Sequence, residues 1–217
     1  MRHSIILVAA VAGLLGGGAL ALSPAGASNY ARVPAAKLVV PNKAARETAY
    51  FAGGCFWGVE GVFEQVPGVI SAVSGYTGGA ERDATYKQVS AGKTGHAEAV
   101  KVVFDPRKVS YTQLMRVYFS VIADPTQLNR QGPDVGRHYR GAFFPVDDRQ
   151  ARQARAYIAQ LGKAGVYDAK IVTKIEPYRF FVTAEGYHQD FMKKNPRHPY
   201  IVRHDAPKVA AYERLFG

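Results

Sequence analysis

Cysteine is almost absent from this chain, since Cys55 is the only one among 217 residues. A lone thiol cannot form a disulfide within its own chain, so an internal disulfide is excluded. Any chemistry at Cys55 is that of a nucleophile, a redox centre or a partner for an external thiol. By residue type alone, a free cysteine is more often a small buried apolar side chain. Its neighbours therefore decide between these interpretations.

Nucleic-acid-binding motifs are also absent, although the chain is strongly basic. It holds 28 Lys and Arg against 17 Asp and Glu, which gives a formal net charge of +11. No block of five or six basic residues occurs, and no basic helix is interleaved with aromatic residues. We interpret the excess as a solvated basic surface and expect no nucleic-acid partner. The length suits one domain with a real core, or two small ones at most.

One long apolar run lies at the N-terminus, where residues 5–22 follow Arg2 and His3. Ala-Gly-Ala at 25–27 has the small-x-small pattern of a cleavage site, so we interpret residues 1–27 as a secretory signal peptide. The alternative is an uncleaved anchor, because 18 apolar residues could just span a bilayer. We expect an exported protein, periplasmic or secreted, without a membrane span after cleavage.

The rest of the chain predicts a linker at 28–46 and a single catalytic domain at 47–217 with an irregular C-terminal tail. Strands are expected at 48–52, 69–74, 97–104, 139–144 and 170–175. Helices are expected at 55–66, 111–121, 147–162 and 184–194. Their order is the split βαβ pattern. We predict an α+β fold, a two-layer sandwich with a ferredoxin-like core and helices packed on a mixed, largely antiparallel sheet.

Cys55 falls at a predicted turn from strand to helix, directly after two glycines. A helix N-terminus carries partial positive charge and free N–H groups. We therefore predict that the pKa of the Cys55 thiol falls below its ordinary value of about 8.5. Phe56 and Trp57 follow, and an aromatic wall beside a thiolate would hold a small apolar group such as a methyl.

Glu98 is the second informative residue, because it lies in the predicted strand 97–104. Side chains alternate between the faces of a strand, so Glu98 shares a face with Val100, Val102 and Phe104. Burial on that apolar face would raise the pKa of the carboxyl and suit it to act as a general acid. The alternative is a solvated position at the frayed end of the strand.

The long loop at 123–138 predicts a functional segment, because irregular stretches of this length are uncommon in compact domains. Asp134 and Tyr139 stand where this loop re-enters the sheet, and Tyr86 is a similar hydroxyl on another loop. His188 could serve Cys55 as a base, since a Cys–His pair widely separated in sequence is a known hydrolase arrangement. Alone, each of these signals is weak.

Several motifs occur together in one order along residues 47–200. They are GCFWGVE at 54–60, GYTGG at 75–79, GHAEAV at 95–100, NRQGPDVG at 129–136 and EGYHQ at 185–189. In this order the set closely resembles the peptide methionine sulfoxide reductase A family. The resemblance implies reduction of methionine S-sulfoxide, free or in proteins, and hence a role in protein repair.

The resemblance also implies a role for each matching residue. Cys55 would attack the sulfoxide sulfur and be left as a sulfenic acid, while Glu98 protonates the sulfoxide oxygen. Tyr86, Tyr139 and Asp134 would complete the polar network around that oxygen. The substrate methyl would lie between Phe56 and Trp57. No cofactor or metal is implied, only an external thiol.

The sequence departs from many relatives of that family, which carry further cysteines near the C-terminus. Residues 195–217 contain none. We therefore predict a one-cysteine cycle in which an external thiol, thioredoxin-like or small, reduces Cys55. The protein is expected to be a monomer.

Three alternatives remain at this stage. A thiol peroxidase would also use a reactive cysteine, and a hydrolase would pair Cys55 with His188. A secreted binding module would use Phe56, Trp57 and the tyrosines as an aromatic pocket and would tolerate Cys55→Ser.

Overall fold

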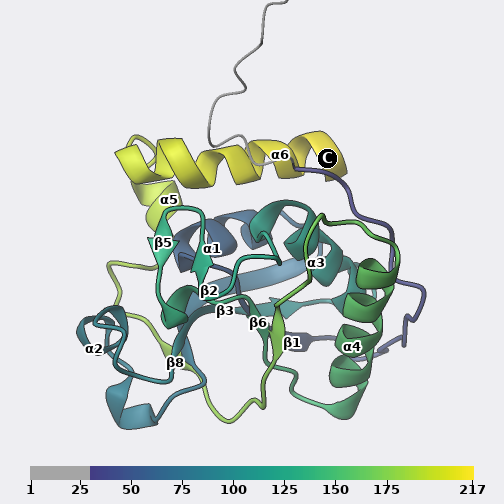
Figure 1. Ribbon diagram of the computed structural model, residues 1–217, viewed down its shortest axis with the longest axis horizontal. Helices are drawn as coiled ribbons and strands as arrows, with labels where there is room; N and C mark the ends of the chain where they lie inside the picture. Colours follow the sequence, from purple (N-terminus) through teal and green to yellow (C-terminus); the bar gives the residue numbers. More distant parts are fainter. Residues whose placement is uncertain (1–29) are drawn as a thin grey trace, which may run out of the picture.

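The computed structural model describes residues 30–217 and has an α+β architecture (Figure 1). The strands are β1 (Glu47–Ala52), β2 (Val69–Thr77), β3 (Ala97–Phe104), β4 (Arg130–Gln131), β5 (Asp134–Val135), β6 (Ala142–Phe143), β7 (Lys174–Ile175) and β8 (Val182–Thr183). The α-helices are α1 (Phe56–Glu64), α2 (Tyr86–Ser90), α3 (Tyr111–Val117), α4 (Asp148–Lys163), α5 (Phe191–Lys194) and α6 (Ala206–Phe216). Two π-helical turns, Tyr118–Ile122 and Ile201–Asp205, continue α3 and precede α6. The predicted signal peptide lies outside the described residues.

The main sheet has the order β7-β6-β1-β3-β2-β8. Strand β3 lies antiparallel between β1 and β2, which α1 connects, and this is the split βαβ arrangement. β6 pairs with β1 antiparallel, and β7 adds to β6 as the parallel neighbour that makes the sheet mixed. The predicted fold class is therefore confirmed.

Side chains along the central strands point alternately to the two faces of the sheet and so form two separate apolar clusters. Phe51 of β1 belongs to the main core beneath the helices, together with Val100, Val102 and Phe104 of β3. The opposite face carries a smaller cluster around Tyr50, Ala52, Ala97, Ala99, Ala142 and Phe144. Strands β1 and β3 are thus buried over most of both faces, and six of the eight residues of β3 are apolar.

The helix ends follow local signals in the sequence. Ser110 caps α3 with a capping box, because its side chain accepts from the Gln113 N–H while the Gln113 side chain accepts from the Ser110 N–H. Asp147 caps α4 by accepting from the N–H of Gln150. The caps start α3 at the residue expected from the sequence and α4 one residue later than expected.

The C-terminal tail is helical, and the expectation of an irregular tail was wrong. Helix α6 starts with Pro207 in its first turn and lies over α1 (Figure 1). Ile201, Ala211 and Tyr212 are buried there. Packing of this sparse apolar stripe, rather than a strong local pattern, orders the tail.

The helix expected at 184–194 was also wrong over most of its length, because only α5 forms. Glu185 and Gln189 direct their side chains to backbone groups elsewhere in the fold. Glu185 accepts from the Tyr86 N–H, and Gln189 exchanges hydrogen bonds with the backbone of Ser74. These contacts hold residues 184–190 in turns.

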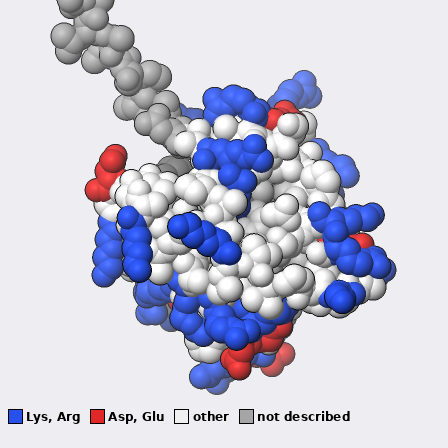
Figure 2. All heavy atoms as spheres, turned by 90° about the vertical axis from the view of Figure 1, so that its right-hand side faces the viewer, with Lys and Arg blue, Asp and Glu red and all other residues white. Residues whose placement is uncertain are grey.

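Residues 30–46 have no regular secondary structure but lie along the domain. Val33 is buried and its N–H donates to Ser120, while the backbone of Lys37 and Val40 donates to glutamines of α4. The face over α4 carries mostly lysine and arginine among its charged side chains (Figure 2). Within residues 30–217, no helix is long and apolar enough to cross a membrane.

Candidate active site

Cys55 occupies the N-cap position of α1, at the end of the turn that follows β1. Gly54 makes this turn with a φ of +93°, which only glycine adopts readily, and a Cβ there would meet the Gln131 side chain at 2.6 Å. Gln131 is in turn tied to Asp124 by two hydrogen bonds. The β4–β5 hairpin is thereby held against the turn. Cys55 itself is 7% exposed.

Glu98 lies beside this turn, on the face of β3 that looks toward α1. Its side chain is 2% exposed, and its Oε2 accepts from the Phe56 N–H at 3.1 Å. Burial raises the pKa of Glu98 to about 8, against the lowering effect of that N–H, and Asp134 and Asp205 raise it further. At neutral pH the carboxyl is mainly protonated and can donate a proton.

The pKa of the Cys55 thiol is raised, contrary to the expected lowering. Burial is the main cause, and the charges of Glu98, Asp205 and Asp134 add to it. The helix N-terminus does act as expected, since the Trp57 N–H lowers the pKa. Desolvation and the carboxyl groups from other elements outweigh this local effect.

Two phenols and a carboxylate converge on the same place from three separate segments. Tyr86 begins α2, Tyr139 ends a 3₁₀ turn at Arg137–Tyr139, and Asp134 begins β5. Burial raises the pKa of both tyrosines, and Glu98 and Cys55 raise it further through their charges. Each phenol therefore stays protonated and can donate a hydrogen bond near Cys55.

Phe56 and Trp57 differ in burial: Phe56 lies in the core, and Trp57 lies at its edge. Phe56 is 1% exposed and packs in the core, with its ring 5.8 Å from that of Tyr76. Trp57 is half-buried and stacks on Phe191 with ring centroids 3.7 Å apart. The rings of Trp57 and Tyr200 are nearly perpendicular, with centroids 5.8 Å apart. An aromatic wall thus stands beside the thiol, built from α1 and the C-terminal segment.

Comparison with known proteins agrees with this geometry. A family model described as peptide methionine sulfoxide reductase matches residues 47–216. The peptide methionine sulfoxide reductase MsrA 2 of Mesorhizobium japonicum is 59% identical over 170 residues, covering 78% of this chain and 87% of that protein. MsrA 2 of Synechocystis sp. is 48% identical over 171 residues, covering 79% and 80%.

The chain belongs to the peptide methionine sulfoxide reductase A family. Two solved structures support the same assignment. Methionine sulfoxide reductase A of Corynebacterium diphtheriae has a TM-score of 0.60 at 35% identity and covers 71% of this chain and 77% of its own. Reduced Mxr1 of Saccharomyces cerevisiae has a TM-score of 0.65 at 32% identity, covering 75% and 92%. This reductase is accordingly a thiol-dependent oxidoreductase.

His188 does not pair with Cys55 as a hydrolase base. Its Nδ1 accepts from the Trp57 indole N–H at 3.1 Å, and no hydrogen bond joins it to Cys55 among residues 30–217. Its ring lies 4.5 Å from that of Tyr86 and 5.0 Å from that of Phe56. Burial lowers the pKa of His188, so the neutral ring positions aromatic side chains of the reductase.

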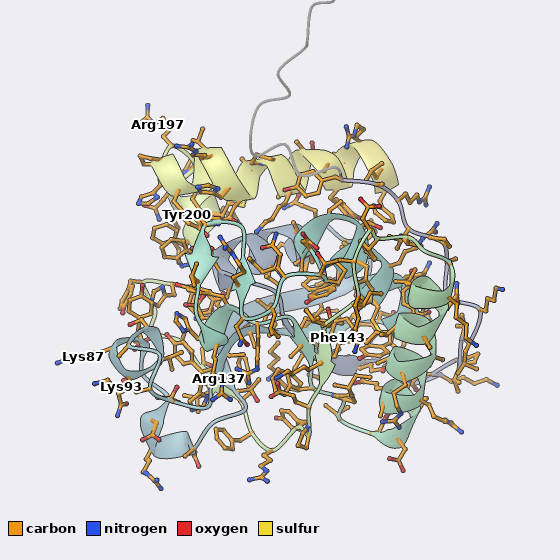
Figure 3. All side chains as sticks on the ribbon, in the orientation of Figure 1. Lys87, Lys93, Arg137, Phe143, Arg197 and Tyr200 are labelled. Carbon is orange, nitrogen blue, oxygen red and sulfur yellow. The ribbon has the colours of Figure 1, made fainter. Side chains whose placement is uncertain are left out.

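Two side chains of this site were missed from the sequence. Tyr200 donates its phenol hydrogen to Asp134 and comes from the segment before α6, beside the β4–β5 hairpin (Figure 3). Glu185 accepts from the Tyr86 N–H at 2.8 Å and from the Tyr76 hydroxyl at 2.9 Å, and so fixes the start of α2. The EGYHQ motif could have flagged Glu185, whereas no local signal marks Tyr200.

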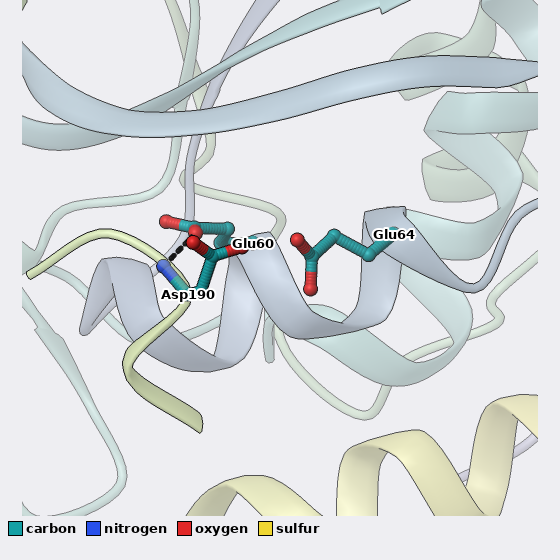
Figure 4. A group of neighbouring side chains, drawn as sticks. All are labelled: Glu60, Glu64 and Asp190. Atoms are coloured by element: carbon teal, nitrogen blue, oxygen red, sulfur yellow. Dashed lines mark hydrogen bonds between the residues drawn. The ribbon is translucent and has the colours of Figure 1, made fainter. Parts of the chain in front are cut away.

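An acidic cluster on the far side of α1 is structural in its contacts. Glu60, Glu64 and Asp190 lie together there (Figure 4). Glu60 is buried and accepts from the hydroxyl and N–H of Ser74 and from the Asp190 N–H. These bonds fasten α1 to β2 and to the start of α5.

Proposed function

We propose that this reductase converts methionine S-sulfoxide, free or in oxidised proteins, to methionine with Cys55 as its nucleophile. The sulfur of Cys55 forms a bond to the sulfoxide sulfur, whose oxygen takes up a proton. The oxygen then passes to the Cys55 sulfur as its bond to the substrate sulfur breaks, and the S–S bond breaks with its electron pair returning to the methionine sulfur. One thiol and one sulfoxide thereby become one sulfenic acid and one thioether. The overall step takes up no proton from solvent.

The observation that supports this chemistry best is a neutral buried carboxyl on β3, beside the turn that carries the thiol. The Phe56 N–H fixes Glu98 at 3.1 Å, and burial keeps the carboxyl mainly protonated at pH 7. A sulfoxide oxygen leaves only when it is protonated, so an acid at this place is what the reaction needs. Tyr86 and Tyr139 would donate hydrogen bonds to that oxygen as its charge develops.

The methyl group of the substrate would lie against Phe56 and Trp57. Stacking on Phe191 and the indole hydrogen bond to His188 fix the plane of Trp57 in advance. A rigid apolar wall costs little entropy on binding. Asp134, held by Tyr200, would complete the polar side of the site.

An external thiol would reduce the sulfenic acid, since Cys55 is the only cysteine. The donor thiolate forms a mixed disulfide with Cys55 and releases water, and a second thiol then frees Cys55. A thioredoxin-like protein with two cysteines would supply both thiols, and a small thiol would act in two encounters. No bound cofactor is needed.

Residues 1–27 would export the chain, so repair would take place outside the cytoplasm. Expression of the full chain followed by N-terminal sequencing of the exported product tests this assignment. A mature N-terminus at or near Ser28 is expected. Retention of residues 1–27 in a membrane fraction would favour the anchor instead.

The central test is an epimer-resolved reductase assay with dithiothreitol as the only reductant. We expect turnover of the S epimer and not of the R epimer, no turnover by Cys55→Ser, and trapping of sulfenic acid on Cys55 by dimedone in a single turnover. Equal rates on both epimers, or unchanged activity in Cys55→Ser, would overturn the proposal. Rapid turnover of peroxide without sulfoxide reduction would favour the peroxidase.

A further inference from the structure

A buried ion pair from the C-terminal helix lies against the helix that carries Cys55. Lys208 Nζ is 3.1 Å from Asp205 Oδ1, and the two side chains are 14% and 0% exposed. Asp205 ends the π-helical turn, and Lys208 lies in the first turn of α6. Figure 1 shows α6 lying across α1.

Gly58 leaves the space for this pair. A Cβ at Gly58 would lie 2.1 Å from Asp205 Oδ1 and 3.0 Å from Lys208 Nζ. Gly58 follows Cys55 by three residues, and residues three apart share one side of a helix. The pair therefore approaches the side of α1 on which Cys55 lies.

A contribution to folding stability does not by itself explain this ion pair. Asp205 Oδ2 is buried and accepts no hydrogen bond among the described residues. A buried carboxylate that is only half satisfied costs free energy, and a buried ion pair is weak evidence for stability. Its charge nevertheless reaches the site, because Asp205 raises the pKa of both Cys55 and Glu98 in addition to the effect of burial.

Lys208 opposes this effect. Burial alone would lower the pKa of Lys208, yet the charge of Asp205 raises it on balance and that of Cys55 contributes in the same direction. Lys208 Nζ lies 3.0 Å from the position of a Cβ at Gly58, about one helical turn from Cys55, so the ammonium is within electrostatic range of an ionised Cys55. A carboxylate and an ammonium of opposite effect are held together within reach of one thiol.

We propose that Asp205 and Lys208 are positioning residues that set the ionisation of Cys55 from the C-terminal helix, the first disfavouring the thiolate and the second favouring it. The proposal rests on the proposed role of Cys55 as the nucleophile. The remaining titratable groups that face Cys55 from neighbouring elements are Glu98 of β3, Asp134 of β5, Tyr86 of α2, Tyr139 and Tyr200. None of these residues is substituted in the variants below.

The experiment measures the rate of iodoacetamide alkylation against pH, which reports the thiolate directly. A single cysteine makes the signal specific to Cys55. Removal of one charge near a partly buried group shifts its midpoint by about one pH unit. We expect Asp205→Asn to lower the midpoint by about one unit, Lys208→Met to raise it by about one unit, and the double variant to return close to the original value.

Two controls separate electrostatics from damage to the fold. Lys208→Arg keeps the charge and should leave the midpoint within about 0.3 units. Asp105→Asn removes a carboxylate that is paired with Arg107. Asp105 follows the end of β3 that is remote from Glu98, so this variant should leave the Cys55 midpoint unchanged. A loosened α6 would expose Cys55 and move the midpoint downward in the Asp205 and Lys208 variants alike.

Opposite shifts in the two single variants support the proposal, and any other combination among folded variants overturns it. If Asp205→Asn does not fold, Lys208→Met decides alone. An upward shift of its midpoint supports the proposal, and no shift overturns it. The pH profile of sulfoxide reduction should move in the same sense as the alkylation midpoint. A failure of the proposed function would appear separately, as activity in Cys55→Ser, because alkylation requires no substrate.

Discussion

Replacement of Glu98 by glutamine tests the acid directly. Glutamine is nearly isosteric, and its carbonyl oxygen can still accept from the Phe56 N–H. A carboxyl with a pKa of about 8 is about 90% protonated at pH 7, whereas one with the ordinary pKa of 4.5 would be about 0.3% protonated. Burial thus raises the protonated fraction of Glu98 at pH 7 about 300-fold. Glu98→Gln removes that proton altogether.

The kinetic result expected is a loss of about 100-fold in kcat with the S-sulfoxide, in line with typical general-acid contributions. The native reductase should also lose activity above a midpoint near pH 8, as Glu98 ionises, and the variant should lack this alkaline decline. Glu64→Gln, an exposed carboxyl on the same α1, should leave the rate unchanged. A variant with the native pH–rate profile would refute the acid role.

The same substitution should stabilise the fold, because an acid with a raised pKa costs stability. The unfolded chain releases this proton near pH 4.5 and the folded chain retains it to about 8, so the free energy of unfolding falls as pH rises between these values. At pH 7 the difference is 2.5 pH units at about 1.4 kcal/mol each, or about 3 kcal/mol. Glu98→Gln should be more stable by about this amount in urea unfolding at pH 7 and equal near pH 4.5. A variant less stable than the native chain at pH 7 would refute the buried, protonated state.

Three further substitutions test the surroundings of the thiol. Tyr200→Phe deprives Asp134 of its donor and should cost about 2 kcal/mol in urea unfolding, with a higher KM; no change in either quantity would remove Tyr200 from the site. Gly58→Ala places a Cβ 2.1 Å from Asp205 Oδ1 and should lower stability by about 2 kcal/mol, detectable as a lower Tm; an unchanged Tm would contradict the close packing. Trp57→Phe keeps an aromatic wall but loses the indole hydrogen bond, so KM should rise while kcat changes less, and the reverse pattern would contradict a binding role.

The central fold could be predicted because its signals are local and strong. The strand 97–104 is apolar on both faces, and its one carboxyl stands out for that reason. The caps at Ser110 and Asp147 mark their helices directly. The short strands β7 and β8 form through pairing with the distant strands β6 and β2. The β4–β5 hairpin pairs locally, but two residues in each strand are too few to show a strand pattern.

The C-terminal part of the site could not be predicted for a different reason. The C-terminal side chains reach the site through contacts with residues far away in sequence. Tyr200 contacts Asp134, and Asp205 and Lys208 lie against Gly58. A π-helical turn followed by a weakly apolar helix gives little periodic signal. Their positions are decided by packing on α1.

The direction of the Cys55 pKa was predicted wrongly because the argument used only the nearest element. A helix N-terminus lowers a thiol pKa in isolation. Here β3, β5 and the turn before α6 add Glu98, Asp134 and Asp205, and burial removes the solvent that would screen them. The sum of these tertiary effects reverses the sign of the local one.

In the proposed mechanism a thiol that is protonated at rest would limit side reactions of Cys55. In the same proposed mechanism the sulfoxide oxygen would gain a proton as the sulfur of Cys55 attacks, and the thiol would lose one in the same step. With the pKa of both Cys55 and Glu98 raised, each group holds its proton at neutral pH. Glu98 can then give its proton to the oxygen and recover one from the thiol, so that no proton crosses from solvent. A thiolate beside a protonated Glu98 would be the more reactive nucleophile, but it would also react with peroxide in the absence of substrate. Raised pKa values for both groups therefore favour attack only when a sulfoxide is present to accept the proton.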